Sequence, residues 1–584
     1  MNKEWSLDVL YKGFQDEKYK EDKVSLQELT KELILFSEAL EQGNKEEETL
    51  IKAVEYLEQF QLLRTKLSYY VALRQSVNTS DSETVNEMNA IEKQLSLSSK
   101  PLAVINKFIA GIKNLEGYIN KHPKLKEYEY FLSEIKKEAK HLLSDDVEDV
   151  IAKLNISAGS AWGSMQSFLT STLEVEYRGN IITFPEVRNK AHSEDVDVRK
   201  DAFAAELKAL EKIKDAVSFS LNNIKTQVNT ICDLRGYESP LDMTLAQAKM
   251  KRETLEAMLE AIREALPSFH KYLKHKAKIM GHEKGLPWYD LFAPIGETTT
   301  TFTVEESKEY LLKHFRSFSK DLADMVEEAY DEEWIDFFPR KGKVGGAFCE
   351  NMPFVKQSRI LTNFTGSLSD VVTLAHELGH AYHGLNIQEH LPLNVDYSMP
   401  VAETASTFNE AIIMEAAILE TEGREKLALI ESQLQDVTQI ICDIYSRYLF
   451  ETAVFDRCKT GFLFADELKE MMLEAQKTAY GDGLDHDYLH PYMWVLKGHY
   501  YSENLSFYNF PYAFGGLFAR GLYEKYKMEG ESFIPKYRAL LNATTIMSVE
   551  DAAKQAEINL EDPNFWRTSL KTIEALIDQF VKLA

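Results

Sequence analysis

Apolar residues recur at intervals of three and four along most of this chain, with charged residues between them. Residues three or four apart share one face of an α-helix, so this spacing predicts amphipathic helices. The run from Leu173 to Phe184 differs, because its β-branched residues surround Arg178-Gly179-Asn180 and predict a hairpin. The segments with helical periodicity are 25–75, 125–170, 193–235 and a helix pair within 242–280.

A second β region is expected between Gly345 and Phe364. An edge strand there could pair with another extended chain through main-chain hydrogen bonds. Gly342, Gly345 and Gly346 precede it and predict either a flexible flap or an ordinary loop, because glycine tolerates unusual backbone angles. The pattern as a whole therefore predicts a helical protein with a small amount of sheet.

The chain is long enough for a large core, with 584 residues of which 44% are apolar. Such a core is expected to divide into two or three lobes. The net charge of −26 argues against nucleic acid and anionic membrane surfaces as partners. The chain has no apolar run of about 18 residues, so no membrane span is expected.

The opening residues and the cysteines indicate a cytoplasmic protein. No apolar segment follows Met1–Trp5, so no signal sequence is expected. The cysteines are widely scattered and lack the CxxC spacing, which favours reduced thiols. Cys349 is expected to pack rather than react. The four cysteines are Cys232, Cys349, Cys442 and Cys458.

One short motif carries recognisable chemistry. Residues 376–380 read His-Glu-Leu-Gly-His, and the apolar run 371–375 before them is compatible with a helix. On a helix, His376 and His380 lie on one face and can bind one zinc ion. Glu377 would then lie beside a metal-bound water and act as its base. The candidates for the helix N-cap are Ser367, Ser369 and Asp370.

A tetrahedral zinc, expected at one per chain, has room for a third protein ligand besides water. Glu403, near the start of a helix predicted from Val401, can face back at the motif. Glu410 lies seven residues on, on the same face, and is expected to orient a ligand imidazole. His383 is nearer in sequence, but it would point past the metal and either support a ligand or pack. The other candidates are Glu389, Asp396 and Glu415.

Several segments together resemble the M3 metallopeptidases, and most closely their oligoendopeptidase F branch. The resemblance runs from about residue 110 to the end of the chain. It implies a zinc endopeptidase acting on short peptides, with an all-helical fold and a deep channel. It also implies that His376, His380 and Glu403 hold the metal and that Glu377 is the base. The matching segments are 172–175, 286–291, 345–347, 360–364, 376–383 and 401–406.

The resemblance also points to a late segment rich in His and Tyr that stabilises the transition state. His499 and Tyr508 match by order and type, and Tyr512 is a further possible donor. Gly515 stands where some relatives have another tyrosine. A neutral His or Tyr can donate a hydrogen bond to the tetrahedral oxyanion without bringing a charge into the site. Tyr500 is expected to pack instead.

These inferences combine into one hypothesis. We expect an elongated, two-lobed all-α fold around a deep substrate channel, with a small β-sheet next to the zinc helix. The expected domains are a helical region at 1–110, a helical and hairpin region at 111–190 and a catalytic region at 191–584. The expected activity is hydrolysis of internal bonds in short unstructured peptides, with zinc-bound water as nucleophile.

Two alternatives stay open. A zinc carboxypeptidase on a similar fold would need a cation to hold the substrate carboxylate. Arg520 and Lys497 are the nearest candidates in sequence. A non-catalytic peptide-binding protein is disfavoured, because an intact base at Glu377 serves no purpose in binding alone.

Overall fold

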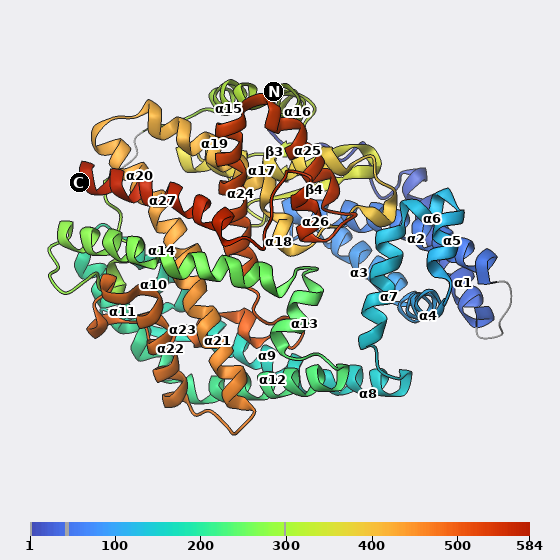
Figure 1. Cartoon of the computed structure of the whole chain (residues 1–584), viewed down its shortest axis with the longest axis horizontal. Helices are drawn as coiled ribbons and strands as arrows, with labels where there is room; N and C mark the ends of the chain where they lie inside the picture. The colour runs from blue at the N-terminus through green and yellow to red at the C-terminus, as the bar shows by residue number, and fades with distance from the viewer. Residues whose placement is uncertain (1–2, 41–45, 297–299) are drawn as a thin grey trace.

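Residues 3–40, 46–296 and 300–584 are described by a computed structural model, in which helices dominate (Figure 1). The segment predicted as helical at 25–75 lies in α1 (Glu17–Leu40) and α2 (Glu46–Val77), except for 41–45, which lie outside the described residues. The other periodic segments also form helices, broken into shorter pieces. Among the described residues no helix is long and apolar enough to cross a membrane.

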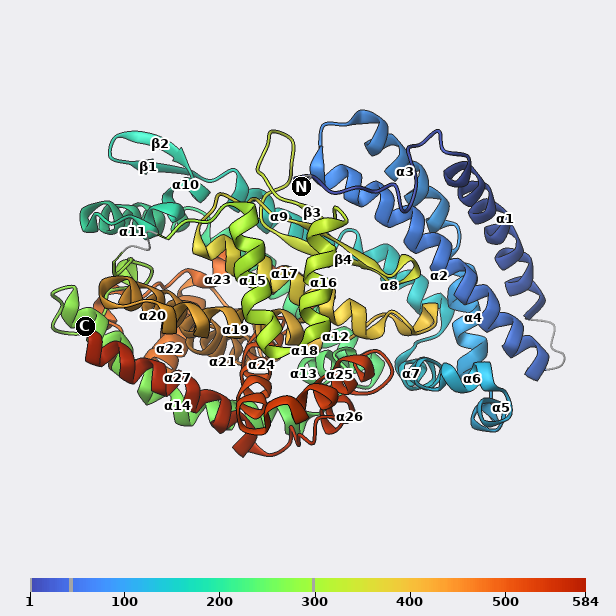
Figure 2. The ribbon, with the colours of Figure 1, turned by 90° about the horizontal axis from the view of Figure 1, so that it is seen from above.

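The first helices form a lobe of their own, at the right of Figures 1 and 2. Its buried core runs from Trp5 to Leu132 and also includes Met352 and Leu361, which come from a sheet much later in the chain. After α1 and α2 the lobe contains α3 (Ser82–Ser96), α4 (Ser99–Gly111), α5 (Leu115–Lys121), α6 (Pro123–Glu127) and α7 (Glu129–Glu138).

A second and larger core runs from Leu173 to Phe580. The helices that precede the sheet next to the motif are α8 (Asp145–Asn155), α9 (Gly159–Ser171), α10 (Phe184–Asn189), α11 (Val196–Leu210), α12 (Lys214–Arg235), α13 (Pro240–Gln247), α14 (Arg252–Ile279), α15 (Val304–Phe318) and α16 (Lys320–Asp331).

The motif helix α17 (Leu368–Ile387) and the helices after it complete this lobe. They are α18 (Met399–Ala402), α19 (Thr404–Glu420), α20 (Gly423–Thr438), a π-helical turn (Gln439–Asp443), α21 (Ile444–Cys458), α22 (Ala465–Tyr480), α23 (Met493–Leu496), α24 (Phe510–Glu529), α25 (Ile534–Ala543), α26 (Val549–Lys554) and α27 (Pro563–Leu583).

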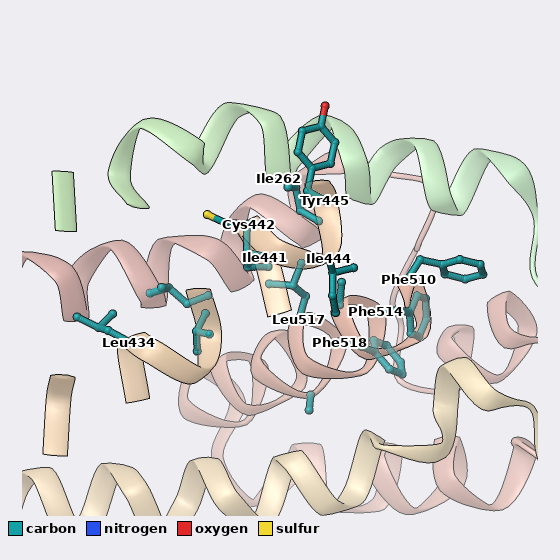
Figure 3. Close-up of a cluster of buried hydrophobic side chains, with 14 of the residues drawn as sticks. Ile262, Leu434, Ile441, Cys442, Ile444, Tyr445, Phe510, Phe514, Leu517 and Phe518 are labelled. Atoms are coloured by element: carbon teal, nitrogen blue, oxygen red, sulfur yellow. The ribbon is translucent and has the colours of Figure 1, made fainter. Parts of the chain in front are cut away.

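Figure 3 shows part of the larger core, where α14, the π-helical turn and α24 meet. Ile262 of α14 and Leu517 of α24 face Ile441 and Cys442 of the turn. Cys442 is fully buried among these apolar side chains. All four cysteines lie in the described residues and are free thiols.

Two small sheets complete the fold. β1 (Glu174–Tyr177) pairs with β2 (Asn180–Thr183), which confirms the predicted hairpin. Arg178 and Gly179 have φ angles of 47° and 80°, as a tight two-residue hairpin turn requires. The second sheet has the order β3-β5-β4, so β4 lies at an edge. Its strands are β3 (Ile335–Asp336), β4 (Phe348–Met352) and β5 (Gln357–Leu361).

The second sheet lies between the first lobe and the motif helix. On one side, the buried guanidinium of Arg359 donates a hydrogen bond of 2.6 Å to the carbonyl of Ser6. On the other side, Asn351 Nδ2 donates to the carbonyl of His380 at 3.0 Å. The turn at Gly342 has a φ of 90° and accepts a hydrogen bond from Thr79 N–H at 2.8 Å. The sheet thus fixes the motif helix relative to the N-terminal helices.

The predicted all-α class, with a small sheet beside the motif helix, is confirmed, and the two lobes are visible in Figure 2. The domain ranges 1–110, 111–190 and 191–584 stay a prediction. The core of the first lobe extends past residue 110 to Leu132.

Candidate metal centre

The motif lies in the middle of α17, which begins at a reciprocal cap. Ser367 Oγ accepts a hydrogen bond from Asp370 N–H at 3.1 Å, and the carboxylate of Asp370 accepts one from Ser367 N–H at 3.0 Å. This capping box starts the helix at Leu368 and places His376 and His380 on one face. Their Nε2 atoms are 3.2 Å apart.

Glu403 lies at a break between two helices. The helix predicted from Val401 is interrupted there, because α18 ends at Ala402 and α19 begins at Thr404. At this break the carboxylate turns back toward α17. Its Oε2 atom is 3.3 Å from His376 Nε2 and 3.5 Å from His380 Nε2. Ser406 Oγ donates to the same oxygen at 2.8 Å and holds the carboxylate in place.

These three donor atoms fit a zinc ion. They are separated from one another by 3.2, 3.3 and 3.5 Å. A tetrahedral zinc with bonds of about 2.0–2.1 Å holds its ligand atoms about 3.3–3.4 Å apart. His376, His380 and Glu403 are all half-buried. His376 and Glu403 also line a pocket of ≈ 660 Å³, so the centre lies at the wall of a cavity.

The charges of the centre favour a cation. Burial raises the pKa of Glu403, but His376 and His380 outweigh burial and hold this pKa at about 2. Burial lowers the pKa of His376, but the hydrogen bonds to Glu403 and Glu410 raise it to about 10. Two carboxylates therefore converge on His376 from opposite sides of its ring. His376 Nδ1 is 2.5 Å from Glu410 Oε1, where the sequence predicted an orienting partner.

Glu377 has the properties of a general base. Its side chain is 5% exposed, and burial raises its pKa to about 7. A base whose pKa lies near the working pH can both accept and return a proton. The neighbouring thiol of Cys349 differs, because burial and the charges of Glu377 and Glu350 raise its pKa well above the ordinary value. That thiol stays protonated.

Two glycines allow the helices to approach this centre closely. A Cβ atom on Gly379 would lie 2.4 Å from the carbonyl oxygen of Ala405 and 2.5 Å from Ser406 Cα. A Cβ on Gly515 would lie 2.9 Å from the Cβ of Glu403. Neither glycine was predicted to shape the site. Their occurrence inside helices, where glycine is unfavourable, is the feature that could have revealed it.

The other candidate ligands lie elsewhere. His383 is fully buried, with Nε2 at 2.8 Å from Thr544 Oγ1 and its ring stacked on Tyr397. Glu389 pairs with Lys356 at 2.5 Å and Glu415 with Lys527 at 3.6 Å. The donor cluster found in the described residues contains His376, His380 and Glu403, and it includes neither these other candidates nor Asp396.

Of the late His/Tyr segment, one residue lines the pocket at the centre, whereas His499 and Tyr508 are not among its lining residues. Tyr512 of α24 lines the same pocket as His376 and Glu403, and its hydroxyl donates to the Tyr508 hydroxyl at 3.1 Å. The His499 ring is 6.0 Å from the Tyr508 ring, and His499 Nε2 is buried without a hydrogen-bond partner.

His499 and Tyr500 differ in their surroundings. Burial, reinforced by the charges of Arg447 and Lys497, lowers the pKa of His499 to about 3, so its imidazole is neutral. Tyr500 is fully buried and packs against Phe450.

Comparison with known families agrees with this site. The model of peptidase family M3 matches residues 190–571, and that of oligopeptidase F matches residues 111–174. The oligopeptidase PepF of Bacillus subtilis is 25% identical over 488 residues, which are 80% of this chain and 71% of that protein. An oligoendopeptidase F homolog of Lactococcus lactis is 25% identical, over 79% of this chain and 77% of that protein.

Solved structures share the fold. The crystal structure of a protein from Chlamydophila abortus covers 98% of both chains, with a TM-score of 0.84 and 18% identity. Oligoendopeptidase F from Enterococcus faecium matches with a TM-score of 0.71 and 18% identity, covering 97% of this chain and 99% of that one. Together with the family models and the His-Glu-x-x-His helix, these similarities show that the chain belongs to peptidase family M3, in its oligopeptidase F branch.

Proposed function

We propose that this protein is a zinc-dependent endopeptidase that hydrolyses internal bonds of short, unstructured peptides. The observation that carries the proposal is the triangle of donor atoms on His376, His380 and Glu403, with the buried carboxylate of Glu377 beside it. These three side chains would hold one zinc ion per chain. When bound, zinc lowers the pKa of a water molecule and polarises the scissile carbonyl.

Glu377 moves the proton. Its carboxylate accepts a proton from the attacking water and later delivers it to the leaving amine. The pKa of about 7 supports both steps, because neither protonation state is strongly disfavoured near neutral pH. Burial also excludes bulk water, which would otherwise compete for the carboxylate.

Tyr508 and His499 stabilise the oxyanion that forms on the carbonyl oxygen. Because Tyr508 accepts a hydrogen bond from Tyr512, its own hydroxyl hydrogen stays free to point at substrate. The imidazole of His499 is neutral and has an unpartnered nitrogen. Donors held in place before the reaction stabilise the charge as it develops.

The β4 edge and two cavities suggest how peptide would bind. β4 lies at the edge of its sheet and is held to the motif helix through Asn351, so an extended peptide could pair with it alongside the metal centre. A cavity of ≈ 1620 Å³ lies between α7 of the first lobe and α12, α13 and α26 of the second. We propose that the two cavities form a channel that admits unfolded chains and excludes folded domains.

The carboxypeptidase alternative has weaker support. Arg520 lines the pocket at the metal centre, but the negative charges of Glu410 and Asp436 already act on it. Lys497 lies near Asp443 instead. Neither cation is clearly reserved for a substrate carboxylate. In a protein that only binds peptides, burying the carboxylate of Glu377 would cost folding free energy and contribute nothing to binding.

The deciding experiment uses a peptide of about ten residues that is blocked at both ends and carries an internal fluorescence quencher. We expect internal cleavage that stops when a chelator is added and resumes with zinc. The variant Glu377→Gln should keep its zinc while turnover falls at least ~10²-fold. Release of single residues only from an unblocked carboxyl end would favour the carboxypeptidase. A zinc-loaded protein without any turnover would favour a binding role.

A further inference from the structure

The larger lobe contains an ion pair that is almost entirely buried. Lys225 of α12 and Glu451 of α21 are 2.6 Å apart, and their side chains are 0% and 2% exposed. Removing two charges from water costs about as much as their attraction returns, so such a pair adds little to stability. A gain in folding stability therefore does not explain why this pair is buried here.

Both partners contact the late His/Tyr segment. While Glu451 Oε1 binds Lys225, Glu451 Oε2 accepts a hydrogen bond of 3.1 Å from Phe507 N–H. The ammonium of Lys225 lies 5.9 Å from the centre of the Tyr500 ring. Phe507 immediately precedes Tyr508, and Tyr500 immediately follows His499. The pair thus touches the neighbours of both proposed oxyanion donors.

Phe507 is the strained point of the segment. Its φ angle is 52°, in the left-handed region that is costly for a residue with a bulky side chain. Such a conformation persists only where its surroundings impose it. Hydrogen bonds also hold the residues on either side: Thr244 Oγ1 donates to the Ser506 carbonyl at 3.1 Å, and Arg447 donates to Asn509 Oδ1 at 2.9 Å. Glu451 is the acceptor at the strained residue itself.

We propose that Glu451, held in place by Lys225, is a positioning residue that fixes the backbone at Phe507 and thereby directs the Tyr508 hydroxyl toward the metal centre. The catalytic part of this inference rests on the proposed function of Tyr508. The structural part, that Glu451 fixes the backbone at Phe507, is independent of that function. Glu451 touches no reacting atom, so it acts through the segment it holds.

Two double variants separate the hydrogen bond from the buried charges. Both replace Lys225 by Met, so neither leaves an unpaired charge. Glu451→Gln keeps an oxygen that can accept from Phe507 N–H, whereas Glu451→Leu does not. We expect the Leu variant to lose on the order of 10- to 100-fold in kcat with little change in KM, as displacement of a catalytic group by about 1 Å does. The Gln variant should recover most of that loss.

Two controls accompany these variants. Arg199 and Asp290 form another buried ion pair, 2.8 Å apart and 3% and 0% exposed, without a hydrogen bond to the late segment. Replacing that pair by Met and Leu should leave kcat near that of the unmodified protein. Hydrogen exchange of a peptide containing Phe507 reports the backbone directly, and it should speed up in the Glu451→Leu variant alone.

Combination with Tyr508→Phe completes the test. If Glu451 acts through Tyr508, the kcat loss of the Leu variant disappears when Tyr508→Phe is already present. Equal kcat in the Gln and Leu variants, or unchanged exchange at Phe507, overturns the inference. Faster exchange with normal kcat overturns its catalytic part. Tyr508→Phe alone then tells whether the proposed donor role fails as well.

Discussion

His376 Nδ1 lies 2.5 Å from Oε1 of Glu410, which is 34 residues away in the sequence. An ionised carboxylate can only accept a hydrogen bond, so Nδ1 carries a hydrogen, and Nε2, which faces Glu403 and His380, is the nitrogen left to bind a metal. This one contact sets the tautomer that a metal ligand needs. Partners of this kind orient ligand imidazoles and raise their basicity.

Glu410→Gln is therefore expected to weaken zinc binding without abolishing it. The amide can accept a hydrogen bond but carries no charge, and loss of such a partner typically costs about 10–100-fold in metal affinity. Titration against a chelator of known affinity measures the change. Glu415→Gln, on the same helix but paired with Lys527, is the matched control. Equal affinities in the two variants would show that Glu410 does not support the site.

Glu403→Ala should have the larger effect on the metal. It removes one of three protein donors, so purified protein should contain much less than one zinc per chain. Metal analysis by mass spectrometry provides the measurement. Glu389→Ala removes an exposed carboxylate that pairs with Lys356 and should leave the zinc content unchanged. A Glu403→Ala protein with full zinc and full activity would refute the ligand assignment.

Gly379→Ala is expected to damage the site without touching a ligand. The added Cβ would lie 2.4 Å from a backbone oxygen of Ala405, so α17 and α19 must move apart. Such overpacking costs about 1–3 kcal/mol of folding stability. We expect a lower melting temperature together with weaker zinc binding, because Glu403 lies at the start of the displaced helix. An Ala variant with normal zinc affinity and stability would contradict this close packing.

Tyr508→Phe tests the oxyanion donor. Removing only the hydroxyl should lower kcat about 10²–10³-fold, since the hydrogen bond strengthens as charge develops on the carbonyl oxygen. KM should change little, because the ground state gains little from the same contact. Steady-state kinetics on the blocked peptide measures both constants. Tyr500→Phe, at a fully buried packing residue, is the control and should be almost silent. A silent Tyr508→Phe together with a large loss of kcat in Tyr500→Phe would show that the donor had been assigned to the wrong tyrosine.

His499 is expected to stay neutral across the working pH range. Burial, with the charges of Arg447 and Lys497, lowers its pKa to about 3, so the ring binds its second proton only in strong acid. Its imidazole resonances should therefore remain constant from about pH 5 to about pH 8, where an ordinary histidine titrates. Histidine-labelled protein measured by NMR, with His499→Gln to assign the signal, provides the test. A titration midpoint near pH 6.5 would contradict the neutral donor.

The parts of the site that follow from local spacing could be predicted from the sequence. The two histidines share a helix face because they are four residues apart, and Glu410 was expected on the face of Glu403 because it lies seven residues, or about two turns, further on. The break at Glu403 was not predicted, since neither glycine nor proline marks that position. The close approach of Gly379 to Ala405 could not be predicted either, because it depends on how α17 and α19 pack against each other. Helix boundaries within 125–170 were missed for a similar reason: apolar periodicity continues across the short connections between α7, α8 and α9.

The shared core of the first lobe and the sheet affects where this protein can be cut. The two family models match residues 111–174 and 190–571, and neither covers the helices before residue 111. Yet Met352 and Leu361, at the ends of β4 and β5, are completely covered by the core of those helices. A fragment trimmed to the spans that the family models match would expose part of this sheet, next to the motif helix, to water. The N-terminal helices are therefore part of the packing that holds this sheet, and shortening the chain before residue 111 removes that packing.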